Sequence, residues 1–459
     1  MIIMIKKNEL HDLAVTDLTY LGAGFAKVAS SEPGDKGEGF AVFIDNALPG
    51  DVVSTKILKV KKNYAFGKIE RILEPSPDRV AAPELYCPVW DKCGGCALLH
   101  MDYDAQLDHK REQAITAFAN EGLAIDFETI SIGDEPFHYR NKAVYPVRAV
   151  MDKGNMTQRI GFFKKNSHMV IENFGCAIVQ PVNEQILTLI KSHKIVPYDE
   201  TTGKGNLRHV FIRQAPSTGE IMVALVVNKN TYTPPKSLIE SLAKIKGMAS
   251  IILNVNDQNT NVAIGKVSRL LWGKETIRDT MGHVSFDISL HSFYQVNSEV
   301  CADLYQDIVS FAEFKGTENV LDAYCGIGTI SLYIAHQVAT VQGIEVVSQA
   351  VNNATENAVL NNIYNVNFTC DTVENALAVN KSQVDTVILD PSRKGLDPTV
   401  IDALLDMSPE KILYVSCNPK TLARDIKALS AQYTITKTKL YDFFPHSLHI
   451  ESLVMLVKK

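Results

Sequence analysis

From about residue 300 onward, short apolar runs alternate with helical patterns, and this alternation restricts the fold more than any other feature of the chain. The runs are, in chain order, "ENVLDAYCG", "ATVQGIEVV", "VNFTCD", "VDTVILDPS" and "KILYVSCNP". Two neighbouring parallel strands need a long crossover between them, which is usually a helix, so strands separated by helices indicate a parallel sheet. The sequence therefore predicts an α/β domain with a doubly wound sheet over residues 291–459.

Two parts of different character precede this domain. In residues 1–73, short β-type runs alternate with turn clusters, a spacing typical of a small antiparallel barrel. The segment "EPSPDRVAAPE" then predicts a linker, because its prolines lack a backbone donor and disfavour helix. Residues 74–290 mix β-type runs with helical patterns, including an expected helix over 104–120. We expect a central α+β domain there.

Composition excludes some classes of protein. The chain is 46% hydrophobic and 21% charged, which is ordinary for a globular protein. The opening "MIIMIKKNEL" has too few apolar residues to form the core of a signal peptide, and no later apolar run approaches the length of a membrane span. Eight cysteines are too sparse for a secreted disulfide framework. We expect a cytoplasmic, monomeric protein with no membrane partner.

The formal net charge of −6 argues against a globally basic nucleic-acid binder, but one stretch is strongly basic. In "KILKVKKNYAFGKIER", residues 56–71, lysines and arginines outnumber Glu70 and surround Tyr64 and Phe66. Basic side chains beside aromatic rings suit RNA phosphates and stacked bases. The alternative is a solvated strand face with core aromatics. The candidates for RNA contact are Lys59, Lys61 and Lys62.

A nucleotide-like cofactor is indicated at the start of the α/β domain. Gly326 and Gly328 follow a strand and open an apolar helix, and Glu345 ends the next strand, where its carboxylate can accept hydrogen bonds from ribose hydroxyls. The turn lacks the third glycine of the dinucleotide fingerprint, which favours S-adenosylmethionine over NAD. Asp371, after the following strand, is either an adenine contact or a helix cap.

Reactive groups follow the later strands. Cys417 lies at the tip of a strand that an Asn-Pro pair ends, and Asp390 follows the strand before it. A lone cysteine is most often a small core residue, but one at the carboxyl edge of such a sheet can be a nucleophile. Near the end of the chain stand His446, His449 and Glu451. Apolar neighbours should raise the pKa of Glu451 and suit it to accept a proton.

Five motifs, "SFYQVN", "DAYCGIGT", "DPSRKGLD", "SCNPKTLARD" and "FPHSLHIE", occur in an order that resembles the RNA uracil-5-methyltransferases, which make 5-methyluridine in bacterial ribosomal and transfer RNA. The resemblance spans the chain. It implies a TRAM barrel of the oligonucleotide-binding type over 1–73 and a central RNA-binding domain over 74–290, with its helix 104–120 packed on the catalytic domain. A Rossmann-like class I methyltransferase domain over 291–459 completes this division.

The resemblance also implies roles for single residues. The Cys417 thiolate would add to C6 of uracil, which makes C5 nucleophilic, and Glu451 would remove the C5 proton after methyl transfer. Phe293 would pack beside the flipped uracil, and flipping favours an unpaired loop uridine. The positions that match cofactor contacts are Gln295, Tyr324, Glu345 and Asp390.

Four cysteines suggest a metal centre. Cys87, Cys93 and Cys96 form a C-x5-C-x2-C cluster, and Cys176 lies farther along the chain. Three clustered cysteines and a distant fourth suit an iron–sulfur cluster better than zinc, although zinc and free thiols remain alternatives. The ribosomal branch of the family carries a 4Fe-4S cluster at this spacing, which would tie the central domain together or contact RNA.

The leading hypothesis is therefore a 23S ribosomal RNA uracil-5-methyltransferase that uses S-adenosylmethionine. A transfer RNA enzyme is the alternative with the same chemistry. A non-catalytic iron–sulfur RNA-binding protein is the alternative from another class, and it would need the cysteines but neither Cys417 nor Glu451.

Overall fold

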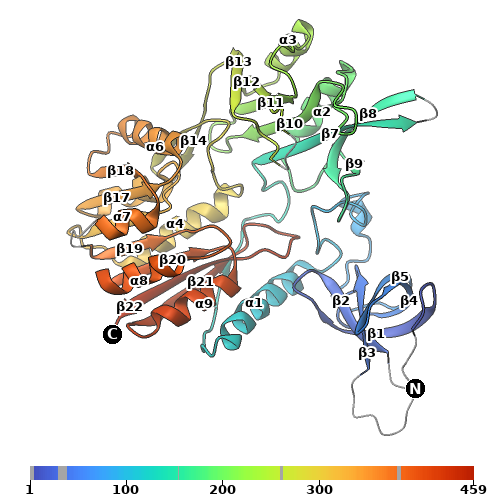
Figure 1. Ribbon diagram of the computed structural model, residues 1–459, viewed down its shortest axis with the longest axis horizontal. Helices are drawn as coiled ribbons and strands as arrows, with labels where there is room; N and C mark the ends of the chain where they lie inside the picture. Colours follow the sequence, from blue (N-terminus) through green and yellow to red (C-terminus); the bar gives the residue numbers. More distant parts are fainter. Residues whose placement is uncertain (1–4, 29–38, 153–154, 259–261, 380–383) are drawn as a thin grey trace. The chain divides into compact units, whose positions relative to one another are not determined.

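The computed structural model describes residues 5–28, 39–152, 155–258, 262–379 and 384–459. The chain forms two compact units, whose elements are labelled in Figure 1. The first unit comprises Met1–Gln113 with Phe444–Leu448, and the second comprises Ala114–Phe443 with His449–Lys459. The predicted domain boundaries at residues 73 and 290 stay predictions. Among the described residues, no helix combines the length and apolar character needed to cross a membrane.

The first unit contains a closed barrel of five strands in the order β1-β2-β3-β5-β4. Side chains along β4 alternate, so that Val53, Thr55 and Ile57 face the core while their neighbours are more exposed. The predicted barrel is confirmed with one correction, since β3 pairs with β5 in parallel. The strands are β1 (Leu10–Leu18), β2 (Ala23–Val28), β3 (Phe40–Asp45), β4 (Val52–Val60) and β5 (Tyr64–Glu74).

After the barrel come a short 3-10 helix, η1 (Pro83–Leu85), and the long helix α1 (Tyr103–Asn120). The chain passes from the first unit to the second within α1. In the second unit, Ala114 and Phe118 of α1 belong to the same buried cluster as residues of the C-terminal sheet. The end of α1 is therefore part of the core of that sheet.

The second unit begins with a seven-stranded sheet in the order β13-β12-β11-β10-β7-β8-β9. Strands β10 and β11 lie in the interior of the sheet and are almost continuously buried. The helices of this part of the chain are α2 (Val182–Ser192) and α3 (Lys236–Ala243). The strands are β7 (Lys142–Asp152), β8 (Asn155–Phe163), β9 (Val170–Glu172), β10 (Leu207–Gln214), β11 (Ile221–Val227), β12 (Met248–Val255) and β13 (Val267–Gly273). A hairpin of β14 (Ile277–Met281) and β15 (Val284–Ile288) follows.

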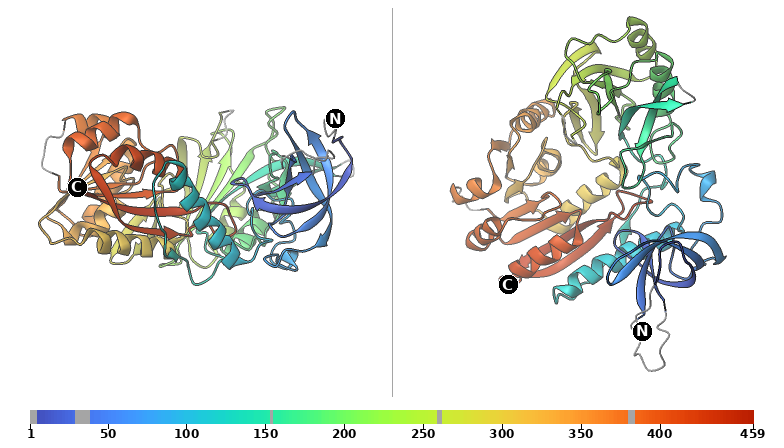
Figure 2. Two further views of the ribbon diagram at one scale, coloured as in Figure 1. Left: turned by 90° about the horizontal axis from the view of Figure 1, so that it is seen from below. Right: turned by 45° about the vertical axis from the view of Figure 1, so that its right-hand side comes forward.

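The C-terminal sheet has eight strands in the order β18-β17-β16-β19-β20-β22-β21-β6. The first five are parallel, and helices lie on both faces of the sheet (Figure 2), so the predicted doubly wound α/β fold is confirmed. The strands are β16 (Asn319–Ala323), β17 (Thr340–Glu345), β18 (Val366–Cys370), β19 (Thr386–Leu389), β20 (Lys411–Ser416), β21 (Tyr433–Tyr441), β22 (Glu451–Lys458) and the edge strand β6 (Ile130–Ser131). The helices are α4 (Ser298–Ala312), α5 (Thr329–Ile334), η2 (Ala335–Gln337), α6 (Ser348–Leu360), α7 (Val373–Val379), α8 (Pro398–Met407) and α9 (Pro419–Leu429).

Candidate active site

The predicted site residues gather along one edge of the eight-stranded sheet. Strands β17, β16, β19 and β20 are neighbours and run parallel, so their carboxyl ends share this edge. Glu345 ends β17, and Tyr324, Asp390 and Cys417 directly follow β16, β19 and β20. Crevices outside the carboxyl ends of parallel strands are where open α/β sheets bind ligands.

Cys417 and Glu451 face one another across two neighbouring strands. Ser416 of β20 pairs with Ser452 of the antiparallel strand β22. Cys417 directly follows β20 and Glu451 is the first residue of β22, so this register, extended by one residue, sets them opposite each other. Opposed residues of antiparallel strands have Cβ atoms about 5 Å apart. The strand ends at Ser416, and Asn418 starts the following helix, because its side chain caps α9 by accepting from the backbone N–H of Lys420 at 3.2 Å.

Burial dominates the electrostatics of this pair. It raises the pKa of the half-buried Cys417 thiol to about 11, and Glu451 adds to the rise. Burial also raises the pKa of Glu451, which is 4% exposed, well above its usual range, with a further contribution from Asp390. The guanidinium of Arg393 opposes both shifts. One cation thus favours both anionic forms that a nucleophile and a base require.

Beside the pair lies a small cavity of about 30 Å³ whose lining includes Phe293, Gln295, Tyr324 and Asp390. The structure therefore brings three of the predicted cofactor contacts together with the predicted base-packing aromatic. Phe293 is 63% exposed, which is unusual for a large apolar side chain and leaves a ring face available for stacking. Burial, followed by the influence of Asp322, raises the pKa of Asp390 to about 7.

Glu345 is held at the glycine turn. Its carboxylate accepts from the backbone N–H of Gly326 at 3.2 Å and of Val347 at 2.8 Å. Gly326 and Gly328 have φ of 57° and 80°, a backbone conformation that glycine adopts without strain. At Gly328 a Cβ atom would also lie 2.8 Å from the ring of Phe368. The turn and the fixed carboxylate suit the ribose of S-adenosylmethionine.

The carboxylate of Asp371 has local partners. It accepts from the backbone N–H of Thr372 at 2.7 Å and from the side-chain amide of Asn375 at 3.1 Å, where α7 begins. These contacts are those of the helix-cap alternative, and the adenine contact stays a prediction.

Sequence analysis missed two side chains at this edge. Asp322 is fully buried in β16, lines the cavity and accepts a hydrogen bond from the hydroxyl of Ser331 at 2.5 Å, while burial raises its pKa to about 7. A charged residue inside an otherwise apolar strand was the available signal. Arg393 stands in the motif "DPSRKGLD", but its influence on Cys417 depends on loop geometry that the motif does not reveal.

His446 belongs to the first unit, where it is buried. Its backbone N–H donates to the side-chain oxygen of Gln106 at 3.0 Å, and its ring Nδ1 lies 3.2 Å from the amide nitrogen of the same residue. Its carbonyl accepts from the N–H of Leu98 at 2.9 Å. These contacts make His446 part of the support of the loop 444–448, which lies shortly before Glu451. His449, the other histidine considered as a base, belongs to the second unit.

The four predicted cluster cysteines are divided between the two units. Cys87, Cys93 and Cys96 lie in one loop of the first unit, where the N–H of Gly95 donates to the Cys93 sulfur at 3.4 Å. Burial raises the pKa of Cys93, and the nearby Cys87 adds to the rise. Within the described ranges, no three His, Cys, Asp or Glu side chains are arranged to hold a metal ion. Cys176 lies in the second unit, so a four-cysteine cluster stays a prediction.

The predicted RNA-contacting lysines lie at the end of the β4–β5 hairpin, where Lys59, Lys61 and Lys62 are exposed. The rings of Tyr64 and Phe66 pack edge to face with centroids 5.4 Å apart, and Phe66 is 41% exposed. These rings lie on the outside of the barrel rather than in its core, which is what an RNA-binding surface requires.

The doubly wound sheet, the glycine turn with its fixed carboxylate and the cavity beside them define the class of S-adenosylmethionine-dependent methyltransferases. The model of the tRNA (Uracil-5-)-methyltransferase family matches residues 102–459, and that of the TRAM domain matches residues 8–69. The chain belongs to the tRNA (uracil-5-)-methyltransferase family. The family predicted from the motifs is thereby confirmed, and with it S-adenosylmethionine as methyl donor and RNA as the class of substrate.

Similar proteins cover almost the whole chain. An uncharacterized RNA methyltransferase of Halalkalibacterium halodurans is 41% identical over 466 residues, spanning 99% of this chain and 98% of that protein. A second, from Listeria innocua, is 39% identical over 469 residues, with 99% of each chain covered. The crystal structure of Pyrococcus abyssi tRNA (uracil-54, C5)-methyltransferase with S-adenosyl-L-homocysteine is 27% identical, with a TM-score of 0.77 over 97% of this chain and 100% of that one.

Proposed function

We propose that this enzyme methylates C5 of a uridine in 23S ribosomal RNA through a covalent bond between Cys417 and C6 of the base. The observation that carries the chemistry is the pairing of Ser416 with Ser452, which sets Cys417 opposite the buried Glu451 beside the cofactor cavity. A nucleophile and a proton acceptor so close together suit a reaction that needs both groups at one uracil ring.

The chain's own residues perform the addition and the elimination. The Cys417 thiolate forms a bond to C6, and the electron pair of the C5–C6 double bond moves into an enolate whose C5 is nucleophilic. Bound S-adenosylmethionine supplies the methyl group that C5 takes up, leaving as S-adenosylhomocysteine. C5 then carries both the methyl group and a hydrogen. The Glu451 carboxylate takes this proton, the double bond forms again and the thiolate leaves C6.

Arg393 favours the anionic forms of both Cys417 and Glu451 during these reaction steps. In the free enzyme the pKa of about 11 keeps most of the Cys417 thiol protonated at neutral pH, and burial raises the pKa of Glu451 as well. Since the guanidinium lowers both pKa values, it increases the fraction of thiolate available for attack. Phe293 lines the cavity and would stack on the flipped uracil. Gln295, Tyr324 and Asp390 of the same lining, with Glu345 at the glycine turn, would hold the methyl donor.

Two classes of RNA are candidate substrates. The TRAM barrel with its exposed lysines and the cysteine loop favour 23S ribosomal RNA, as the sequence predicts. Transfer RNA is the second candidate, because the 27% identical Pyrococcus abyssi protein is a tRNA (uracil-54, C5)-methyltransferase. We further propose that the enzyme acts as a monomer in the cytoplasm.

Incubation with labelled methyl donor separates the two substrates. Unmodified 23S ribosomal RNA and unmodified transfer RNA are offered at equal concentration, and the products are digested to nucleosides. We expect labelled 5-methyluridine from the 23S transcript alone. Label in transfer RNA alone would replace the proposed substrate and leave the chemistry intact, whereas label in another nucleoside would refute the chemistry.

We also propose that Cys87, Cys93, Cys96 and Cys176 bind a 4Fe-4S cluster. The support is the sequence spacing, three clustered cysteines and a distant fourth. No step of the methylation is assigned to the cluster. Protein purified without oxygen should contain about four irons per chain and lose them when Cys93→Ser is introduced. Stoichiometric zinc, or no metal, would contradict the proposal.

A further inference from the structure

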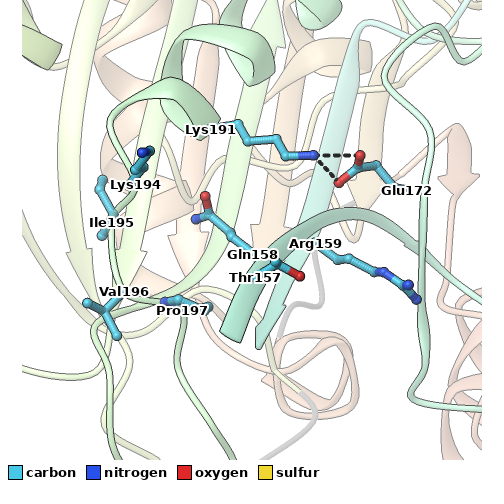
Figure 3. A pocket seen from close by; sticks show the side chains of 9 residues that line it. All are labelled: Thr157, Gln158, Arg159, Glu172, Lys191, Lys194, Ile195, Val196 and Pro197. Carbon is cyan, nitrogen blue, oxygen red and sulfur yellow. Dashed lines mark hydrogen bonds and ion pairs between the residues drawn. The ribbon is translucent and has the colours of Figure 1, made fainter. Parts of the chain in front are cut away.

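A second and larger pocket lies in the seven-stranded part of the second unit (Figure 3). It has a volume of about 720 Å³ and is lined by β8, by Glu172 of β9 and by the segment from Lys191 to Pro197 at and after the end of α2. Pockets that bind small molecules or nucleotides fall in the range of about 300–1,000 Å³. None of its lining residues contributes to the cavity beside Cys417.

The side-chain amide of Gln158 lines this pocket. The side-chain oxygen and nitrogen of Gln158 are both buried, and neither has a hydrogen-bond partner among the described residues. Figure 3 shows the amide pointing toward Lys194 and Ile195, with the ion pair of Lys191 and Glu172 on its other side. On the neighbouring strand Gln158 is opposite Ala149, which has no polar side chain to offer. An unsatisfied buried amide is costly, so a ligand with one donor and one acceptor is expected here.

The pocket is also lined by three cationic side chains. The Lys191 ammonium contacts both carboxylate oxygens of Glu172, at 2.6 and 2.7 Å, and is therefore neutralised. Arg159 and Lys194 also line the pocket, and within the described part of the chain neither forms an ion pair. Two unpaired cations beside a buried amide suit an anionic ligand, such as one that carries a phosphate.

An apolar wall completes the site. Ile195 and Pro197 are buried, whereas Val196 is 52% exposed. The carbonyl of Val196 accepts from the N–H of Asn206 at 2.9 Å and of Leu207 at 3.2 Å, which fixes this segment against β10. A rigid apolar surface next to an amide suits the face and the edge of a planar ring.

We infer that this pocket binds one nucleotide of the RNA substrate, other than the uridine that is methylated. The Gln158 amide contacts the edge of the base, the ring lies against the segment 195–197, and Arg159 and Lys194 hold the phosphate. An amide that both donates and accepts matches a base edge, and the cations match the backbone. The inference rests on the proposed function, because it takes RNA as the substrate.

Two variants test the inference through RNA affinity. In Arg159→Ala/Lys194→Ala, the Kd for the RNA should rise about tenfold, and the slope of log Kd against log salt should fall by about 1.4 because two phosphate contacts are lost. In Gln158→Leu, the Kd should rise about fivefold with an unchanged salt slope, since no charge is removed. The matched control is Lys246→Ala, which removes an exposed lysine of the same unit outside the pocket. Its Kd should stay within about twofold of the wild type.

Further measurements distinguish the possible failures. Each variant should bind S-adenosylhomocysteine and form 5-methyluridine at saturating RNA as the wild type does, which shows that it is folded. Unchanged RNA affinity in both pocket variants would overturn the inference. Competition of RNA binding is also measured with adenosine 5′-monophosphate and uridine 5′-monophosphate. If the pocket binds these nucleotides while the RNA affinity of the variants stays unchanged, the pocket is a site for free nucleotides, and this result would also overturn the inference. If the wild type modifies transfer RNA instead, the proposed substrate fails, and the same variants are tested with that RNA.

Discussion

At the scale of single residues, one guanidinium serves two reactive groups. Arg393 lowers the pKa of Cys417 and of Glu451, against the burial that raises both. Its own side chain is exposed, and its carbonyl accepts from the Asn418 amide at 3.0 Å, which ties its loop to the strand end that carries the thiol. The arrangement increases thiolate while keeping the base in an apolar setting.

Replacing Arg393 by Gln should therefore reduce the reactivity of Cys417. Without the guanidinium, the pKa of the thiol rises further above about 11, so less thiolate is present at any pH below that value. Alkylation of Cys417 by iodoacetamide, followed by mass spectrometry between pH 7 and 10, should slow about tenfold for each unit by which the pKa rises. Turnover should fall by a similar factor. The control Lys394→Gln should alkylate at the wild-type rate, and an unchanged rate in Arg393→Gln would remove the proposed role.

Residue patterns predicted some of these groups and not others. Cys417, Asp390 and Glu345 stand at strand ends, which apolar runs and breakers locate directly. The sequence did not predict Asp322 because its effect depends on its burial, nor Arg393 because its effect depends on a loop that approaches from another strand. Likewise, a sequence shows that Gln158 is polar but not that its amide is buried without a partner.

At the scale of elements, the loop 444–448 is held by one side chain of α1. Gln106 is fully buried, and its amide donates to the carbonyls of Leu98 at 3.1 Å and Met101 at 2.8 Å while its oxygen accepts from His446. Leu448 packs on a small cluster with Leu98 and Met101. The loop leads into Glu451 after two further residues, so its support bears on the position of the base.

Gln106→Met should loosen this loop. The variant keeps the volume but leaves buried partners unsatisfied, each at a cost of about 1–3 kcal/mol. We expect a lower thermal unfolding temperature, slower turnover and some RNA trapped covalently, because a displaced Glu451 removes the C5 proton slowly. Gln113→Met on the same helix is the control, since the Gln113 amide contacts the ring of His109 on its own helix, at 2.7 Å, and not the loop 444–448. Wild-type stability and turnover in Gln106→Met would contradict this role.

The β4–β5 hairpin carries the second prediction at this scale. Replacing Lys59, Lys61 and Lys62 by Ser should weaken RNA binding and make it less dependent on salt, because fewer counter-ions are released. Affinity for S-adenosylhomocysteine should stay unchanged. Fluorescence anisotropy at several salt concentrations measures both effects, and Lys27→Ser elsewhere on the barrel is the comparison. An unchanged salt slope would show that the hairpin has another role.

Elements with a clear period were predicted well, and the exceptions have physical causes. Strand β3 pairs in parallel with β5 because β4, the next strand along the chain, pairs with β1 rather than with β3 and so closes the barrel. No local sequence pattern predicts this pairing. The edge strand β6 has only two residues, too few for a detectable period.

At the scale of the whole molecule, the two compact units share the chain in an interleaved way. The chain enters the second unit within α1, returns to the first at residues 444–448 and then enters the second again with His449. The first unit thus contains part of the motif "FPHSLHIE" that ends in Glu451. Removing the first unit would therefore remove the contacts of Gln106 with His446 as well as the barrel. The net charge of −6 is compatible with RNA binding because cations are concentrated at the hairpin.

The most direct measurement compares what three forms of the enzyme leave on RNA: the wild type, Cys417→Ala and Glu451→Gln. Each is incubated with labelled methyl donor and unmodified RNA, then analysed by denaturing gel and mass spectrometry. The wild type should release 5-methyluridine, and Cys417→Ala should give neither methylation nor adduct, since no enolate forms. Glu451→Gln should accumulate protein bound covalently to methylated RNA, because addition and methyl transfer proceed while the C5 proton stays in place. Methylation by Cys417→Ala, or normal turnover by Glu451→Gln, would contradict the account.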